Sequence, residues 1–189
     1  MNLENYWGYD MDRFTDHSGG ARGSDTAWDY IGKQFGVINF RHYWHPGLPK
    51  PPLGNIQITD DELEEGWERV LFANKTLNRM PGKYKSLLGR NWFQVKNSDA
   101  IFAIGNVERN QVAGGTGWAV QMAIDAAKPV YVFDQKTRQW LSWNRTMFID
   151  CLAPSLTFDY AGIGTREIDV NGAEAIRNTY KRTFNYNNL

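Results

Sequence analysis

The chain has 189 residues, which is the size of one ordinary domain and too short for two full cores. A hydrophobic fraction of 42% with 22% charged residues is typical of a folded globular protein, and no segment approaches the run of about 20 apolar residues that a membrane span requires. Lys plus Arg equals Asp plus Glu at 21 each, with no long block of either sign, which argues against a duplex-DNA-binding surface. The polar start of the chain does not resemble a secretion signal and there is one cysteine, so we expect a cytoplasmic protein.

The first predicted helix follows a glycine-rich turn, Ser18-Gly-Gly-Ala-Arg-Gly-Ser-Asp25. We expect Ser24 or Asp25 to cap this helix and Gly36 to end it. Its inner face would carry Ala27, Trp28, Ile31 and Phe35. The segment 45–54 is rich in proline and glycine, so it is predicted to be an irregular surface excursion within the same domain.

Two more helices are predicted next. Thr59 and Glu62 have the spacing of a capping box. Apolar residues continue from it at helical spacing, at Leu63, Trp67, Val70, Leu71 and Leu77. A further helix is expected over 84–95, with Leu88, Trp92 and Val95 on its inner face.

Two short apolar runs, 101–104 and 130–133, lack polar alternation, as is typical of parallel strands covered on both faces. Between them, Val120, Ile124 and Ala127 form one helical stripe, so the region is predicted to be a βαβ crossover. Near the end of the chain, Asn171 is expected to cap a helix that carries Ile176, Tyr180 and Phe184. The sequence therefore predicts a single α/β domain of Rossmann-like type, with a doubly wound, mainly parallel sheet and a core over about 16–184.

Three glycine-bearing turns are candidates for anion binding: 18–25, 113–118 and 161–167. Glycine lets the backbone approach a phosphate closely, and a following helix offers free N–H groups at its positive end. A tight turn or close packing explains any one of them equally well. Arg22 and Arg166 lie in or beside two of the turns and are candidate phosphate partners, although each is also typical of a solvated surface.

Other polar residues have open alternatives. Asp25 and Asp134 are candidate acceptors for ribose hydroxyls or a base edge, and Asp25 is equally a candidate helix cap. His42 and His45 are three residues apart, but no nearby cysteine or acidic residue completes a metal set, so we predict no metal site. The 27 aromatic residues, eight Trp, nine Tyr and ten Phe, mainly serve packing, and a few could stack on a base.

At these turns the chain resembles the SLOG superfamily, over about 16–167. This group of Rossmann-like proteins includes the LOG-type nucleotide phosphoribohydrolases, nucleotide-sensing domains of bacterial defence systems and the DNA-processing protein of natural transformation. The LOG signature Pro-Gly-Gly-x-Gly-Thr-x-x-Glu corresponds to Ala113-Gly-Gly-Thr-Gly-Trp-Ala-Val-Gln121, with Trp118 in place of the signature Thr and Gln121 in place of the catalytic Glu. The first turn, together with Arg90-Asn91 and the segment 97–104, most resembles uncharacterised phage and bacterial SLOG-like proteins, and 161–166 resembles the DNA-processing branch.

The resemblance implies a nucleotide-derived ligand at the carboxyl ends of the strands and a homo-oligomer. An amide supplies neither the negative charge nor the proton acceptor of the catalytic Glu, so we favour a protein that binds a nucleotide or a cyclic or ADP-ribose-type signal without cleaving it. Such a protein in a phage would act as a sponge against host immune signalling. The alternatives are a nucleotide N-glycosidase that uses Asp25 or Glu167, and a single-stranded nucleic-acid binder, which the zero net charge disfavours.

The predicted site needs no separate cofactor. Its expected ligand-binding residues are Ser18, Gly19, Gly20, Arg22, Ser24, Asp25, Gly114, Gly115, Thr116, Gly117, Trp118, Gln121, Asp134 and Arg166. In this prediction the glycines and Thr116 hold phosphates, Arg22 and Arg166 balance their charge, Gln121 faces the ribose and Trp118 forms a wall for a base.

Overall fold

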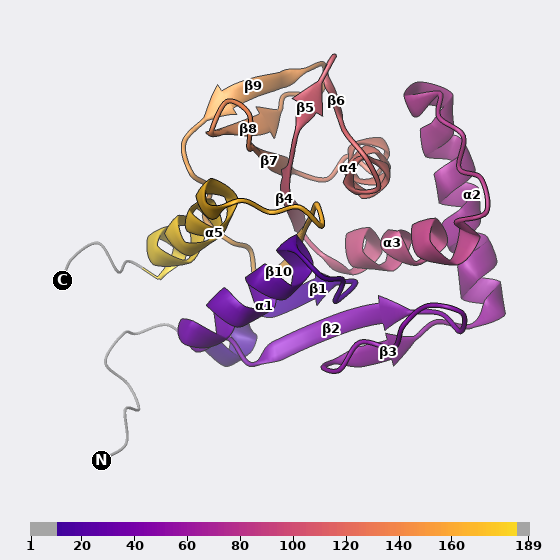
Figure 1. Cartoon of the computed structure of the whole chain (residues 1–189), viewed down its shortest axis with the longest axis horizontal. Coiled ribbons are helices and arrows are strands. Elements are labelled where there is room, and N and C mark those ends of the chain that lie inside the picture. Colours follow the sequence, from indigo (N-terminus) through magenta and orange to yellow (C-terminus); the bar gives the residue numbers. More distant parts are fainter. Residues whose placement is uncertain (1–10, 185–189) are drawn as a thin grey trace.

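A computed structural model describes residues 11–184 and contains one large eight-stranded sheet flanked by five helices (Figure 1). The strands of the large sheet are β1 (Thr15–Ser18), β2 (Asn39–Trp44), β3 (Asn55–Gln57), β4 (Ala100–Gly105), β7 (Val130–Asp134), β8 (Gln139–Trp143), β9 (Phe148–Cys151) and β10 (Asp159–Gly164). The helices are α1 (Ser24–Gln34), α2 (Asp60–Leu77), α3 (Lys85–Asn97), α4 (Thr116–Asp125) and α5 (Val170–Thr183). A short hairpin of β5 (Val107–Glu108) and β6 (Gln111–Val112) and a 3₁₀ turn over Met11–Arg13 complete the elements.

The order of strands in the large sheet is β3-β2-β1-β10-β4-β7-β8-β9. The pairs from β3 to β7 are all parallel, and β8 and β9 add an antiparallel edge. From β1 the chain winds outward to β2, whereas from β4 it winds in the opposite direction to β7, and β10 lies between the two halves. This reversal is the topological switch point, where open α/β sheets form their ligand crevice at the carboxyl ends of the strands.

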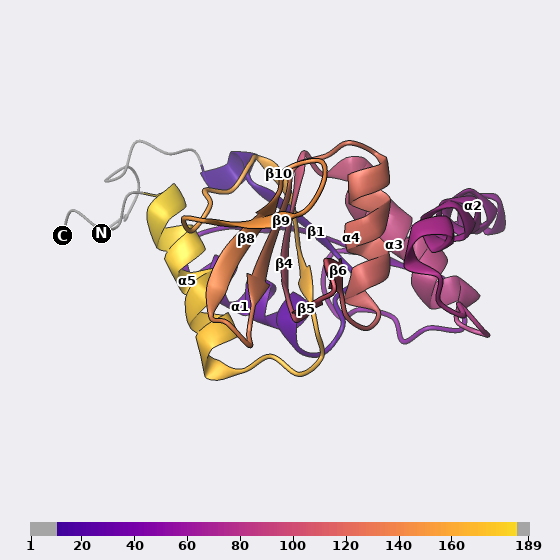
Figure 2. The same ribbon diagram turned by 90° about the horizontal axis from the view of Figure 1, so that it is seen from above.

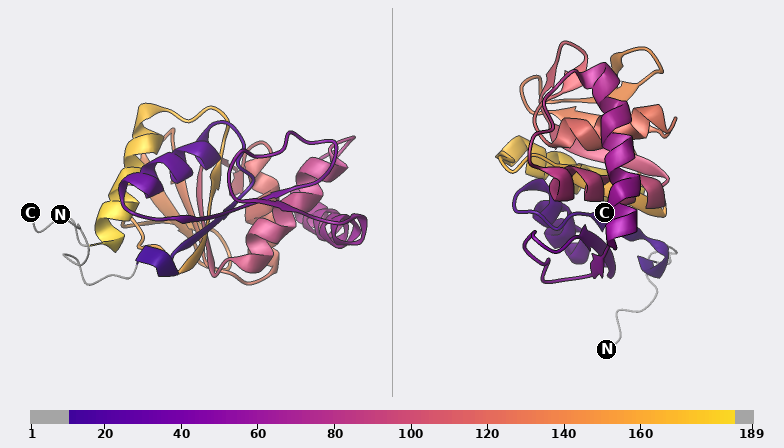
Figure 3. Two further views of the ribbon diagram at one scale, coloured as in Figure 1. Left: turned by 90° about the horizontal axis from the view of Figure 1, so that it is seen from below. Right: turned by 90° about the vertical axis from the view of Figure 1, so that its right-hand side faces the viewer.

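Helices cover both faces of the sheet. Figure 2 shows the sheet nearly edge-on, with α1 and α5 on one side and α3 and α4 on the other. Helix α2 forms an outer layer that packs on α3 and α4, and Figure 3 shows it running across them at the far end of the molecule. The predicted α/β class with a doubly wound, mainly parallel sheet is therefore confirmed.

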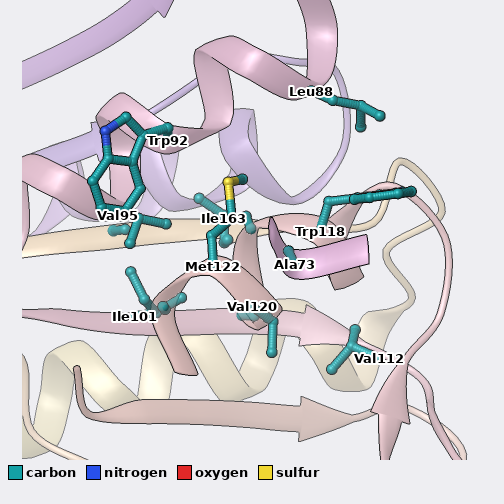
Figure 4. Close-up of a cluster of buried hydrophobic side chains, with 14 of the residues drawn as sticks. Ala73, Leu88, Trp92, Val95, Ile101, Val112, Trp118, Val120, Met122 and Ile163 are labelled. Atoms are coloured by element: carbon teal, nitrogen blue, oxygen red, sulfur yellow. The ribbon is translucent and has the colours of Figure 1, made fainter. Parts of the chain in front are cut away.

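Each face of the sheet has its own core. Figure 4 shows part of the larger core, which gathers Met122 and Val120 of α4, the strand residues Ile101 and Ile163, and Trp92 of α3. The smaller core, under α1 and α5, is dominated by aromatic rings. Fully buried members of this core contact one another through edge-on, tilted or stacked rings: Trp28, Tyr160, Phe102, Tyr180 and Phe184. Much of the aromatic content of the sequence is thus used for packing.

The capping box that the sequence predicts is present at the start of α2. The Thr59 side chain accepts a hydrogen bond from the Glu62 N–H at 3.2 Å, and the Glu62 carboxylate accepts one from the Thr59 N–H at 2.8 Å. The predicted inner face of this helix is wrong at Leu71, which is 49% exposed, because the buried stripe runs through Leu63, Gly66, Val70, Ala73 and Leu77.

Three smaller sequence predictions are corrected at helix ends. The N-cap of α1 is Gly23, because the Ser24 hydroxyl and the Asp25 carboxylate bond to neighbouring loops. The N-cap of α5 is Asp169, whose side chain accepts from the Gly172 N–H at 2.7 Å, and Asn171 lies within the first turn. Ala127 follows the end of α4 with a φ of 55°. Gly36, with a φ of 89°, follows the end of α1 as expected.

Helices α2 and α3 approach each other through two glycines. A Cβ at Gly66 would lie 2.1 Å from the carbonyl oxygen of Gly89, and a Cβ at Gly89 would lie 2.8 Å from Leu63 Cδ1. This close approach determines how near α3 lies to α2, and so where the residues that follow Gly89 on α3 are placed. Of the helices in residues 11–184, none combines the length and the apolar character needed to cross a bilayer.

Candidate functional site

A cavity of about 590 Å³ lies at the switch point, beyond the carboxyl ends of the parallel strands. Four loops contribute to it: the turn between β1 and α1, the loop between α2 and α3, the turn before α4, and the connection from β10 to α5. Its lining includes Ala21, Asp25, Leu88, Arg90, Asn91, Gln94, Gly114, Gly115, Thr116, Trp118, Ile163 and Arg166. The structure therefore brings residues of all three predicted glycine-bearing segments to one crevice.

A second cavity of about 970 Å³ adjoins the first. It lies under the irregular segment 45–54, which contributes Gly47, Leu48 and Pro49. The remaining lining includes Gly19, Gly20, Arg22, Tyr43, Trp44, Lys83, Ser86, Arg90 and Arg166. The proline-rich excursion thus forms one wall of this cavity.

The first glycine turn is closed by its own side chains. Asp25 accepts hydrogen bonds from the N–H groups of Gly19 and Ala21, each at 3.2 Å, and the Ser18 hydroxyl accepts one from the Gly20 N–H at 3.1 Å. The Asp25 carboxylate therefore accepts the hydrogen bonds that a bound phosphate would otherwise accept from these N–H groups. A phosphate would have to displace Asp25 or Ser18 to use the N–H groups of Gly19 and Gly20.

Burial shifts the pKa of Asp25. Desolvation raises the pKa of this carboxyl, and the nearby positive charge of Arg90 and the two backbone hydrogen bonds oppose that rise. Beneath the turn, Asp16 lies fully buried, with one oxygen bonded to the Gly162 N–H at 2.8 Å and the other without a partner among residues 11–184. Burial and the neighbouring Asp29 raise the pKa of Asp16 well above its ordinary value.

Arg90 is the central charged side chain of the crevice. It projects from α3, is only 5% exposed, and lines both cavities. Its guanidinium lies against the backbone of Gly19, where a Cβ would come within 1.3 Å of Nη1. With the Gln94 amide oriented so that its oxygen faces Arg90, Gln94 accepts from this guanidinium and from the Gly19 N–H. Burial lowers the pKa of Arg90, and the Asp25 charge opposes that shift.

Two further arginines face the same region. Arg166 follows β10 and lines both cavities, and Arg22 lines the larger one. Within residues 11–184, no carboxylate oxygen lies within 4.0 Å of the guanidinium nitrogens of Arg22, Arg90 or Arg166. The crevice thus contains three guanidinium groups that no ion pair within this part of the chain neutralises.

The second glycine turn is open. A Cβ at Gly114 or Gly115 would meet no atom within 4 Å, and both residues are exposed at the start of α4. Arg79 fixes the turn from behind by donating to the carbonyl oxygens of Gly114 at 3.2 Å and Val112 at 2.7 Å. Gly117, by contrast, is a packing residue, since a Cβ there would lie 2.0 Å from the Val112 carbonyl oxygen.

The third predicted turn is mostly strand. Residues 159–164 form β10, so only 165–167 remain as a loop. Gly162 allows Trp28 of α1 to pack on the strand, because a Cβ at Gly162 would lie 2.6 Å from the indole ring. The Ser24 hydroxyl donates to the Thr165 carbonyl oxygen at 2.8 Å and ties this loop to the first turn. Arg166 is brought to the crevice by that link.

Several predicted ligand-binding residues lie elsewhere or serve packing. The Gln121 amide donates to Asp125 at 2.9 Å, and the Asp134 carboxylate accepts from Val107 N–H, Lys136 N–H and the Thr137 hydroxyl. In the described part of the chain, neither Gln121 nor Asp134 is part of the lining of the two cavities. Trp118 does line the smaller cavity, but it is only 5% exposed and belongs to the larger core (Figure 4).

Each histidine pairs with a carboxylate. His17 bonds Asp159 at 2.8 Å, His42 bonds Asp29 at 3.0 Å, and His45 bonds Asp60 at 2.9 Å. Over 11–184 there is no group of three or more His, Cys, Asp or Glu side chains placed to hold a metal ion. His17 thus links β1 to β10, His42 links β2 to α1, and His45 links the loop after β2 to the start of α2.

Sequence reasoning did not assign Arg90, Asn91 and Gln94 to the site. All three are at least nine-tenths buried on α3 and face the smaller cavity. The available signal was the spacing of Arg90 and Gln94, which at i and i+4 share one face of a helix that also carries the apolar residues Leu88, Trp92 and Val95. A polar pair inside such a helix indicates a cleft or a buried network.

Comparisons with known proteins give no relative for this chain: no protein-family model, curated protein or solved structure matches it.

Proposed function

We propose that the crevice at the switch point binds a phosphorylated, nucleotide-type ligand without cleaving it. The observation that carries this proposal is the convergence of Arg22, Arg90 and Arg166, without an ion-pair partner in residues 11–184, on cavities at the carboxyl ends of parallel strands. Of the three, only Arg90 is buried, whereas Arg22 and Arg166 are exposed residues that line the cavities. A buried guanidinium is costly unless an anion or a hydrogen-bonding network satisfies it, and phosphate accepts its fork of N–H donors well.

The smaller cavity has the character of a nucleoside pocket. Leu88, Trp118 and Ile163 give it apolar walls, and the buried amides of Asn91 and Gln94 offer a few oriented polar groups. The free start of α4 at Gly115 and Thr116 adds backbone donors on the same side. The predicted resemblance to the SLOG superfamily is compatible with this function.

The absence of turnover is proposed from the surroundings of three residues. Gln121 stands at the position where the LOG signature carries its catalytic Glu. Its amide donates a hydrogen bond to Asp125, and it lines neither of the two cavities. Asp25, the buried carboxyl of the smaller cavity, already accepts two backbone N–H groups, which fixes it as a structural acceptor rather than a free base. Glu167 lines both cavities, but it is exposed to solvent on the loop after β10, unlike the buried Asp25.

The test is calorimetry with a panel of nucleoside monophosphates, ADP-ribose and cyclic dinucleotides, followed by chromatography of the recovered ligand. Wild type should bind at least one compound and return it unchanged. Arg166→Ala should weaken that binding by about 1.5–3 kcal/mol, the scale of a charge-assisted hydrogen bond. Arg182→Ala, at an exposed arginine near the end of α5, is the matched control and should bind as wild type does.

Two results would overturn the proposal. The first is equal affinity of Arg166→Ala and wild type for every ligand that binds. The second is robust release of a free base that Asp25→Asn or Glu167→Gln abolishes and Gln121→Ala leaves intact, which would identify the N-glycosidase alternative.

A further inference from the structure

The two cavities are parts of one continuous binding region. Six residues line both of them: Ala21, Tyr84, Leu87, Arg90, Arg166 and Glu167. Two of the six are the arginines without ion-pair partners in residues 11–184. With two guanidinium groups and one carboxylate, Glu167, the shared wall has a net charge of +1 where the two cavities meet.

The cavities differ in charge away from that wall. The smaller cavity adds one carboxyl, Asp25, to the shared residues and no further cation. The larger cavity adds two cations, Arg22 and Lys83, and no further carboxyl. A neutral ring thus suits the smaller cavity, whereas a part that carries negative charge suits the larger one.

Size argues against a mononucleotide that occupies the whole region. At about 590 and 970 Å³, each cavity alone falls within the range of roughly 300–1,000 Å³ that is typical of a complete small-molecule site. A mononucleotide bound at the shared arginines would leave one of the two cavities without a ligand part. Two linked halves would use both.

We infer that the ligand has two parts, namely two nucleoside-like halves joined through phosphates. The bridging phosphates lie at Arg90 and Arg166, one neutral ring enters the smaller cavity beside Asn91, and the second half enters the larger cavity beside Arg22 and Lys83. This inference rests on the proposed function and specifies the class of its ligand.

The experiment compares matched probes by calorimetry. For each of the common bases, a nucleoside monophosphate is paired with the corresponding dinucleoside pyrophosphate. We expect one dinucleoside pyrophosphate per chain to bind at least about tenfold more tightly than its monophosphate. A single-stranded tetranucleotide is a third probe, expected to bind more weakly than the dinucleoside pyrophosphate.

Two variants separate the cavities. Gly115→Phe places a ring at the rim of the smaller cavity, at a position with ordinary helical φ and ψ of −65° and −34° and open space around its Cβ. The double variant Arg22→Ala/Lys83→Ala removes the two cations found only in the larger cavity. Each should weaken the dinucleoside pyrophosphate by about tenfold or more, and Arg182→Ala should not. Circular dichroism establishes that each variant is folded.

The outcomes distinguish the two proposals. Equal affinity for monophosphate and dinucleoside pyrophosphate, or an unchanged affinity of the Arg22/Lys83 double variant, overturns the two-part ligand and leaves the proposed function standing. Tightest binding of the tetranucleotide also overturns it. If no phosphorylated probe binds the wild-type protein, both proposals fail.

Discussion

The two glycine-rich turns at the crevice have similar sequences and opposite roles. In the first turn, Asp25 holds the backbone N–H groups, Arg90 lies against Gly19, and a Cβ at Gly23 would lie 2.5 Å from the Arg166 Cα. In the second turn, Gly114 and Gly115 face open space. Glycine serves close packing in the first turn and access in the second. A glycine motif therefore indicates a phosphate site only where its N–H groups remain free.

The largest expected effect is on folding, at Gly23. This residue has a φ of 106° and lies against backbone atoms of Arg166, so Gly23→Ala combines backbone strain with a steric clash. We expect it to lower the free energy of unfolding by about 3 kcal/mol or more. Gly115→Ala, in the open turn, should cost at most about 1 kcal/mol. Urea titration of both variants measures the difference, and similar costs would remove the contrast between the turns.

The next effect concerns Asp25. Asp25→Ala removes the carboxylate that accepts from the Gly19 and Ala21 N–H groups and whose charge acts on Arg90, so we expect a loss of about 2–3 kcal/mol in unfolding free energy. Thr116→Ala is the counterpart in the second turn and should change it by less than about 0.5 kcal/mol. Amide hydrogen exchange provides a local readout: Gly19 and Ala21 should lose protection in Asp25→Ala. Retained protection there would show that Asp25 does not close the turn.

The smallest expected effect is a dependence of the unfolding free energy on pH, which arises from Asp16 in the strand beneath the first turn. Because the folded-state pKa of Asp16 is raised above its ordinary value of 3.8, the folded protein binds more protons than the unfolded chain just above that pH. This contribution is greatest at low pH and is lost as the pH rises through the folded pKa. Asp16→Asn should remove it and make the protein about 1 kcal/mol more stable than wild type at neutral pH.

Thermal unfolding at several pH values tests this prediction. The difference between wild type and Asp16→Asn cancels the opposing contribution of His17, whose pKa is lowered by burial. Asp12→Asn, at an exposed position, is the control and should parallel wild type. A difference between wild type and Asp16→Asn that does not change with pH would contradict the assignment.

The parts of the fold that the sequence predicted best are those in which local chemistry and tertiary packing agree. The apolar runs that became β4 and β7 are buried on both faces, and Thr59 with Glu62 caps α2 through contacts within four residues. Residues 161–164 were misassigned to a turn because Gly162 packs against Trp28, a residue more than 130 positions away. No local pattern carries that information.

The candidate site was predicted in outline. The crevice does contain Asp25, Gly114, Gly115, Thr116 and Arg166. Arg90 was not assigned to it, because a helix pattern identifies the apolar stripe and gives no reason for a buried guanidinium beside that stripe. Its place depends on a glycine in a different loop and on how closely α3 approaches its neighbours.

The glycine contact between α2 and α3 has a consequence for the tolerance of this protein to mutation. Gly89 precedes Arg90 directly, so any side chain at Gly66 or Gly89 that separates the two helices also moves the guanidinium relative to Gly19. In a saturation library selected only for ligand capture, positions 66 and 89 should therefore accept as few substitutions as the crevice itself. Such a library would show that ligand binding depends on the contact between α2 and α3, although the ligand does not touch that contact.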